Sequence, residues 1–283
     1  MYVSRDDLID VFEDTEKLYQ TDETLRKSIA DSIAGTKIYM EGEMPILPQK
    51  KFTDNTNVTV NKYRTFETAQ FFKRKYPELK VAVLNFASAT NPGGGVTHGS
   101  RAQEEALCRC STLYPTLKTK TLWKKYYEFH RNRQDVLYTD ACIYTPDILV
   151  IKSDESIPQR MPTDKWIKVD VLTCAAPNLR EIPNKMNPVS DKTVRVSDNE
   201  LFEIHIQRAK QIISVAAHHD VDILILGAFG CGAFSNKPSV VANAYSEVIP
   251  RFNGYFKEIC FAVYCPPKSG DENFKAFDKV FKK

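Results

Sequence analysis

The chain has 283 residues, of which 42% are hydrophobic, so it can bury a sizeable core in one large domain or in one domain with an appendage. Its 39 basic and 36 acidic residues leave a formal net charge of +3, which does not indicate nucleic-acid binding. Seven cysteines without a C-x-x-C pair indicate reduced thiols rather than disulfides or a zinc site. Acidic residues interrupt the N-terminal segment and no run of about 18 apolar residues occurs, so we expect a cytoplasmic protein without a membrane span.

The first 60 residues are more polar than the rest, and we expect them to form an N-terminal, mainly helical accessory segment. Its end holds one extended piece, "NVTVNKY" (57–63). A helix is predicted from Thr65, where "TFETAQFFKRKY" precedes the first of five runs rich in Val, Ile and aromatic residues. These runs mostly lack polar alternation, which is typical of strands buried on both faces at the centre of a sheet. They span 81–87, 147–153, 166–176, 221–230 and 258–265.

Helices are predicted between these strands. Over residues 198–219, apolar side chains recur at spacings of 4, 3, 4 and 3 and therefore lie on one stripe of a helix. They are Phe202, Ile206, Ala209, Ile213 and Ala216. Another helix is predicted from Pro238, with Ser235 or Asn236 as its cap. The alternation of strands and helices predicts an α/β fold.

Three consecutive glycines, Gly93 to Gly95, follow the strand at 81–87, and a helix is predicted from about Ala102. A glycine-rich turn between a strand and a helix can direct backbone N–H groups at a phosphate. The run matches neither a nucleoside-triphosphate loop nor the spacing G-x-G-x-x-G. Glu104 and Glu105 lie in the first turn of the helix, where helix-end electrostatics alone would also explain them.

A second glycine-rich loop follows the strand at 221–230 and contains Gly227, Gly230 and Gly232. Ligands of open α/β sheets bind outside the carboxyl ends of the strands. The two loops together therefore indicate a clamp for a diphosphate, with Phe234 against the adjoining sugar. No histidine neighbours Cys231 in sequence, so the demand for a tight backbone explains its position better than nucleophilic catalysis does. No metal or cofactor site is predicted.

At these residues the sequence resembles the bacterial-type poly(ADP-ribose) glycohydrolases, which are macrodomains with a GGG and then a QEE signature. The resemblance rests on "LNFASATNPGGG", "AQEEALCRCSTLY" and "GAFGCGAF", and it covers residues 61–283. It implies a three-layer α/β/α macrodomain with a mixed central sheet, preceded by the accessory segment 1–60. It also implies hydrolysis of the ribose–ribose O-glycosidic bond of poly(ADP-ribose), at chain ends, with release of ADP-ribose.

The resemblance also implies roles for single residues. Glu105 is the expected general acid/base, Glu104 and Asn91 hold the ribose, and Gln103 supports the loop. The backbone from Gly93 to Val96 is expected on one side of the diphosphate and that from Gly230 to Phe234 on the other. The full set of expected substrate-binding residues is Asn91, Gly93, Gly94, Gly95, Val96, Gln103, Gly230, Cys231, Gly232, Ala233 and Phe234. The segment "NFKAF" offers Phe274 and Phe277 for adenine stacking.

Two alternative functions stay open at this point. One is a hydrolase that removes single ADP-ribose units from modified protein or nucleic acid. The other is a macrodomain that binds ADP-ribose without catalysis, which the intact run Gln103-Glu104-Glu105 disfavours. The expected partner is ADP-ribose or poly(ADP-ribose) on modified protein, without a membrane, without direct reading of nucleic acid, and with the chain acting as a monomer.

Overall fold

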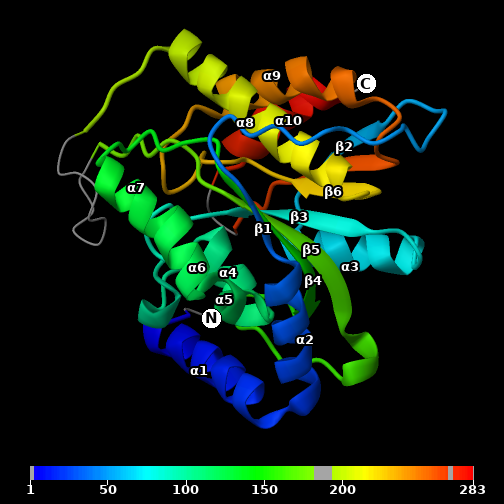
Figure 1. Cartoon of the computed structure of the whole chain (residues 1–283). Coiled ribbons are helices and arrows are strands. Elements are labelled where there is room, and N and C mark those ends of the chain that lie inside the picture. Colours follow the sequence, from blue (N-terminus) through cyan, green and yellow to red (C-terminus); the bar gives the residue numbers. More distant parts are fainter. Residues whose placement is uncertain (1–2, 182–192, 267–269, 283) are drawn as a thin grey trace.

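The computed structural model describes residues 3–181, 193–266 and 270–282, and these residues form a seven-stranded sheet with the order β1-β4-β5-β3-β6-β7-β2 (Figure 1). The sheet is mixed, because β4 pairs antiparallel with β1 and β5 while the other neighbours are parallel. The strands are β1 (Lys37–Tyr39), β2 (Asn57–Asn61), β3 (Val81–Phe86), β4 (Cys142–Val150), β5 (Ile167–Cys174), β6 (Ile223–Leu226) and β7 (Glu258–Ala262).

The five central strands are the five that the sequence predicts. Strand β4 begins at Cys142 rather than at residue 147, since Pro146 interrupts the apolar run at the point where the register between β4 and β5 shifts. Strand β6 ends at Leu226 rather than at residue 230, because the chain turns into the second glycine-rich loop. Their apolar side chains form the core on both faces of the sheet.

Both edges of the sheet come from the N-terminal part of the chain. Strand β1 pairs with β4, and β2, within the extended piece 57–63, pairs with β7. The first 60 residues also form helices α1 (Arg5–Thr21) and α2 (Glu23–Gly35). They therefore contribute strands to the same sheet as the rest of the chain, and a division into two units at residue 60 stays a prediction.

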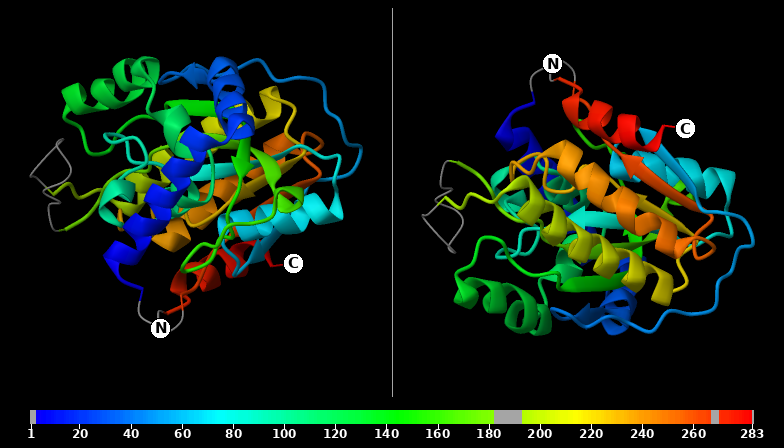
Figure 2. Two further views of the ribbon diagram at one scale, coloured as in Figure 1. Left: turned by 90° about the horizontal axis from the view of Figure 1, so that it is seen from below. Right: turned by 90° about the horizontal axis from the view of Figure 1, so that it is seen from above.

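Helices cover both faces of the sheet, which confirms the three-layer α/β/α arrangement. Side chains of α8, α9 and α10 pack on one face, and those of α1, α3, α4 and α5 pack on the other (Figure 2). The remaining helices are α3 (Thr65–Lys75), α4 (Gln103–Cys110), α5 (Leu113–Leu117), α6 (Lys120–Leu122), α7 (Glu128–Arg133), α8 (Asp198–His218), α9 (Pro238–Val248) and α10 (Glu272–Phe281).

The structure confirms the predicted apolar stripe of α8 but not the predicted N-cap of α9. Four of the five stripe residues of α8 are buried and the fifth, Phe202, packs against the same core. Helix α9 begins at Pro238 as predicted, but its N-cap is Lys237 rather than Ser235 or Asn236. Asn236 does not cap the helix because its amide donates to the Pro177 carbonyl at 2.7 Å.

Candidate active site

A cavity of about 920 Å³ lies at the carboxyl ends of the parallel strands. Its walls come from the segments that follow β3, β5, β6 and β7 and from the start of α4, so the two glycine-rich loops meet in one cavity. The expected site residues in these walls are Asn91, Gly94, Gly95, Gln103, Glu104, Glu105, Gly230, Gly232, Ala233 and Phe234. Gly93, Val96 and Cys231 do not line the cavity within the described part of the chain.

Gln103 fixes the start of α4 against β3. Its side-chain oxygen accepts a hydrogen bond from the Phe86 N–H at 2.9 Å, and its amide nitrogen donates to the Leu84 carbonyl at 2.7 Å. The same nitrogen donates to the Thr65 hydroxyl at 3.1 Å, at the start of α3. One side-chain amide therefore joins a strand and two helices, and it sets the position of the two glutamates that follow.

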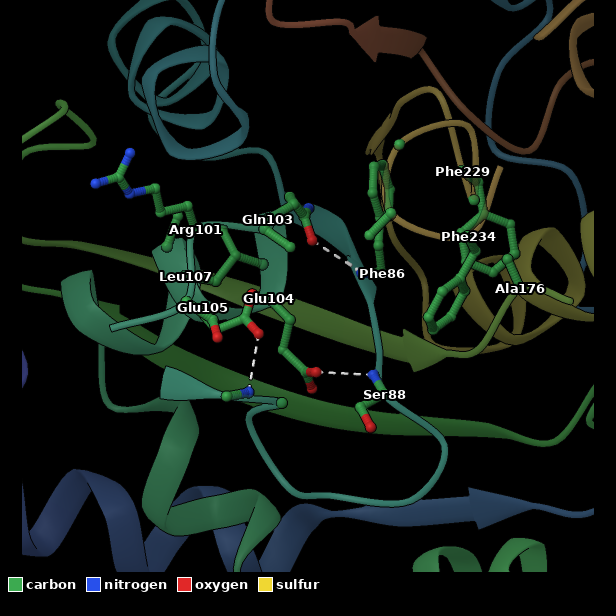
Figure 3. Close-up of a pocket in the computed structure, with 18 of the residues that line it drawn as sticks. Phe86, Ser88, Arg101, Gln103, Glu104, Glu105, Leu107, Ala176, Phe229 and Phe234 are labelled. Atoms are coloured by element: carbon green, nitrogen blue, oxygen red, sulfur yellow. Dashed lines mark hydrogen bonds between the residues drawn. The ribbon is translucent and has the colours of Figure 1, made fainter. Parts of the chain in front are cut away.

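Glu104 is held by hydrogen bonds on both of its oxygens. Oε2 accepts from the Ser88 N–H at 2.7 Å and Oε1 accepts from Asn85 Nδ2 at 3.2 Å (Figure 3). The Gly93 N–H also bonds to this carboxyl. Burial, and then the charge of neighbouring Glu105, raise the pKa of Glu104 from 4.5 to about 8, although these hydrogen bonds act in the opposite direction. Glu104 therefore holds a proton at neutral pH.

Glu105 has one carboxyl oxygen without a hydrogen-bond partner. Oε1 accepts from the Gly95 N–H at 2.9 Å, whereas the buried Oε2 has no partner among the residues that the structure describes. Figure 3 shows Glu104 extending to Ser88, whereas Glu105 is bonded to Gly95, so the two neighbouring carboxyls have different partners. Glu105 lines the cavity, and its buried Oε2 is a carboxyl oxygen that has no partner among the described residues.

The three consecutive glycines leave room for other groups of the protein. Gly94 has φ +60°, and a Cβ there would lie 2.5 Å from Oε1 of Glu105. A Cβ on the first glycine would lie 2.6 Å from the Tyr114 ring, and one on the third would lie 2.3 Å from Ser100 Oγ. The bare backbone is therefore required by the folded protein itself, and most directly by the carboxyl pair.

The N–H groups of this first loop also have acceptors within the protein. Gly93 and Gly95 donate to the two carboxyls, and Gly94 donates to the Asn91 carbonyl at 2.9 Å. The Val96 N–H donates to the Gly93 carbonyl at 3.2 Å, and the Val96 side chain is buried. Each backbone N–H group from Gly93 to Val96 therefore has an acceptor within the protein. None of them is left over for the expected contact with a diphosphate.

The second loop differs, because three consecutive N–H groups in it have no acceptor among the described residues. They belong to Gly232, Ala233 and Phe234. The loop is closed instead by the Ser235 N–H, which donates to the Gly232 carbonyl at 3.1 Å. A Cβ on Gly232 would meet no atom within 4 Å. Successive N–H groups in a turn can form an anion-binding concavity. All three of these residues line the cavity.

Cys231 turns away from the cavity. Its thiol lies 3.7 Å from the Phe229 carbonyl, and burial raises the pKa of the thiol. A protonated thiol outside the cavity is a poor nucleophile. Gly230 beside it has φ +78°, and a Cβ there would lie 2.6 Å from Ala176, so this glycine is required by packing.

Arg131 on α7 fixes the turn that carries Asn91, and sequence reasoning missed this residue. Its Nε donates to the Thr90 carbonyl at 2.7 Å and its Nη2 donates to Asn91 Oδ1. Its guanidinium lies 4.7 Å from the ring centroid of Trp123. No local pattern joins residues 90 and 131, so the sequence holds no signal for this contact.

The two phenylalanines expected to stack on adenine do not line the cavity. Phe277 is fully buried in the core, because it lies on the inner face of α10. Phe274 lies beneath the Lys62 ammonium, 4.5 Å from it. Tyr264, which follows β7, does line the cavity, and the Arg64 guanidinium lies 3.9 Å from its ring centroid.

Over residues 3–181, 193–266 and 270–282, no group of three or more His, Cys, Asp or Glu side chains is arranged to hold a metal ion. Within the same ranges, none of the helices is both long enough and apolar enough to span a bilayer.

Comparisons with known proteins agree on one family. A family model described as the catalytic domain of microbial-type PARG matches residues 8–153. The structure is similar to a poly(ADP-ribose) glycohydrolase from Thermomonospora curvata, with a TM-score of 0.81 and 29% identity over 97% of this chain and 99% of that one. It is also similar to the enzyme from Deinococcus radiodurans in complex with ADP-ribose, with a TM-score of 0.71 and 28% identity over 90% and 96% of the two chains. A comparison with curated proteins gave no match.

Proposed function

The chain belongs to the microbial-type poly(ADP-ribose) glycohydrolase family, and from this premise we propose that Glu105 is the general acid/base of its reaction. It is a glycosidase that hydrolyses the ribose–ribose O-glycosidic bonds of poly(ADP-ribose) and releases ADP-ribose. The observation that carries the assignment of Glu105 is its buried Oε2, which has no partner among the described residues and belongs to a side chain in the cavity wall.

The terminal ADP-ribose unit is placed between the carboxyl pair and the second glycine-rich loop. The N–H groups of residues 232–234 supply donors for its diphosphate, and Glu104 and Asn91 hold its ribose. Tyr264 is the aromatic residue after β7 that can stack on the adenine. The cavity of about 920 Å³ is within the range of about 300–1,000 Å³ for small-molecule sites. This size supports binding of one unit at a chain end.

The reaction needs a proton for the leaving oxygen and a water molecule for the sugar carbon. Oε2 of Glu105 gives its proton to the oxygen that joins the two riboses, and the bond from this oxygen to the anomeric carbon breaks. Water then attacks that carbon, which has oxocarbenium character, and returns a proton to Glu105. Glu104 stays fixed by Ser88 and Asn85 throughout. Burial raises the pKa of Glu104 to about 8, so this neighbour of Glu105 holds a proton at neutral pH, which supports the proposed proton transfer.

The substitution Glu105→Gln tests this assignment. It keeps the size of the side chain but removes the exchangeable proton, so kcat on poly(ADP-ribose) should fall by about 10²- to 10⁴-fold. The Kd of ADP-ribose, measured by calorimetry, should change by less than several-fold. Glu203→Gln on the exposed side of α8 is the matched control and should keep wild-type turnover. Full turnover by Glu105→Gln would remove Glu105 from the chemistry.

Action at chain ends is tested by the products formed early in the reaction. An enzyme that works from the ends releases free ADP-ribose from the first turnovers, while the remaining polymer shortens gradually. Cleavage within chains would instead give oligomers before free ADP-ribose accumulates. Chromatography of labelled polymer at less than one-tenth conversion separates these outcomes, and early oligomers would refute the proposal.

The protein is further proposed to act as a cytoplasmic monomer on chains attached to protein. All seven cysteines are free thiols in the structure, and five of them are buried. Free thiols suit a reducing compartment. Light scattering of the purified protein would test the monomeric state, and a dimer mass would contradict it.

A further inference from the structure

The cavity continues past the carboxyl pair to a wall that the reaction described above does not use. This wall consists of Arg5, Gly99, Ser100 and Arg101, all of which line the cavity. In Figure 3, Arg101 lies on the opposite side of the carboxyl pair from Phe229 and Phe234. The cavity is therefore longer than the space beside the second glycine-rich loop. We call these four residues the arginine wall.

A short series of contacts joins the arginine wall to Glu105. The Gly95 N–H donates to Oε1 of Glu105 at 2.9 Å. Gly95 also lies against Ser100, since a Cβ added to it would be 2.3 Å from Ser100 Oγ. Gly99 has φ +66°, and a Cβ on it would lie 2.4 Å from the Arg5 carbonyl oxygen. The first residue of α1 is thus placed next to the loop that holds the general acid/base.

Helix α1 is fixed to the catalytic helix α4, so the place of Arg5 is well defined. The Thr15 hydroxyl donates to the Arg109 carbonyl at 2.7 Å, and the Tyr19 hydroxyl donates to the Ser111 carbonyl. The ring of Phe12 packs edge-on against Tyr114, with 4.9 Å between the ring centroids. The N-terminal segment therefore forms a permanent part of the cavity on this side.

The arginine wall carries two cations at exposed positions. The Arg5 side chain makes no hydrogen bond or ion pair with any residue that the structure describes. Arg101 is tied to the start of the chain, since its Nη2 donates to the Val3 carbonyl. A guanidinium presents several donors in a rigid plane that matches the oxygens of a phosphate, and it stays charged at any physiological pH.

We propose that Arg5 and Arg101 bind the diphosphate of the second ADP-ribose unit, the one that leaves, and thereby favour polymer over a single attached unit. This inference rests on the proposed function. The terminal unit fills the part of the cavity beside the second loop. The leaving ribose is joined to it through the single oxygen that Glu105 protonates, so its own diphosphate extends to the other side of the carboxyl pair. The arginine wall is the cationic surface on that side.

The experiment compares the wild type with Arg5→Ala, with Arg101→Ala and with the double variant. For the double variant, kcat/KM on poly(ADP-ribose) should fall about tenfold, and for Arg5→Ala about threefold. The Kd of free ADP-ribose should change less than twofold, because it has no second unit. The loss should shrink as salt is added, since exposed charges are screened at high ionic strength. Lys17→Ala is the control, because it removes one charge from an exposed position of the same helix.

Each outcome decides the proposal. An unchanged kcat/KM on polymer in the double variant would overturn the proposal. A loss of affinity for free ADP-ribose as large as the loss of kcat/KM on polymer would also overturn it, because the arginines would then bind the terminal unit. Arg5 lies on α1 and not on the catalytic helix, so an effect of Arg5→Ala alone cannot come from a distorted α4 if the unfolding midpoint is unchanged. No turnover of polymer by the wild type would instead refute the proposed function itself.

Discussion

Both glycine-rich loops lie at the same end of the sheet, yet they differ in what occupies the space beside their glycines. In the first loop, the space beside Gly94 is filled by Glu105, and the loop N–H groups bond to protein acceptors. In the second loop, the space beside Gly232 is open, and three successive N–H groups have no acceptor among the described residues. The first loop therefore makes room for the two carboxyls, and the second leaves open the space that we propose for the ligand.

This difference separates catalysis from binding. If Glu105 transfers the proton as proposed, a change in the first loop moves that carboxyl, and a misplacement of about 1 Å costs about 10²-fold in rate. If the second loop binds the diphosphate as proposed, a change there alters contacts made in both the ground state and the transition state, so it affects affinity more than kcat. The following predictions test this separation.

The largest effect is expected for Gly94→Ala. The new Cβ would lie 2.5 Å from Oε1 of Glu105, and φ +60° costs about 1–2 kcal/mol for a residue other than glycine. We expect kcat on polymer to fall at least about a hundredfold and the unfolding midpoint to drop. Gly42→Ala is a matched control, since Gly42 has φ +77° and open space beside it outside the cavity. Equal kcat for both variants would contradict the role given to the first loop.

An intermediate effect, measured as a change in stability with pH, is expected for Glu104→Gln. The pKa of Glu104 is about 8 in the folded protein and near 4.5 when unfolded, so the folded state binds the proton more tightly. This contribution to stability is fully present below about pH 4.5 and is lost as the pH rises through about 8. The glutamine stays neutral, so the stability of the wild type relative to the variant should fall by at most about 1.4 kcal/mol per pH unit across that window.

Urea unfolding of both proteins from pH 5 to pH 9 measures this difference. Parallel curves for the two proteins would show that Glu104 does not take up its proton in the folded state. The same titration of Glu203→Gln, at an exposed position, should run parallel to the wild type.

The smallest effect is expected for Gly232→Ala. The added methyl group meets no protein atom within 4 Å, so the free energy of unfolding should stay within about 0.5 kcal/mol of the wild type. It does enter the space proposed for the diphosphate, so the Kd of ADP-ribose should rise about three- to tenfold with kcat nearly unchanged. Unchanged affinity in calorimetry would show that the ligand does not approach this loop.

The sequence by itself determined the central strands, helix α8 and the places of both glycine-rich loops, because apolar periodicity and glycine runs are local signals. It also placed Glu104 and Glu105 in the first turn of α4, from the glycine run that separates a strand from a helix. It offered Phe274 and Phe277 for adenine stacking, but neither lines the cavity, because the sequence does not show which face of α10 meets the core.

Only the tertiary structure decided what surrounds each glycine of the two loops. The neighbours that fill or leave open the space beside Gly94 and Gly232 come from other segments, and no local pattern records them. The same holds for Arg131 on the turn of Asn91, for Arg5 in the cavity wall, and for the edge strands β1 and β2. Periodicity reports which side of an element is apolar, but which residues meet across the molecule depends on how helices and strands pack, and that is settled only when the whole chain has folded.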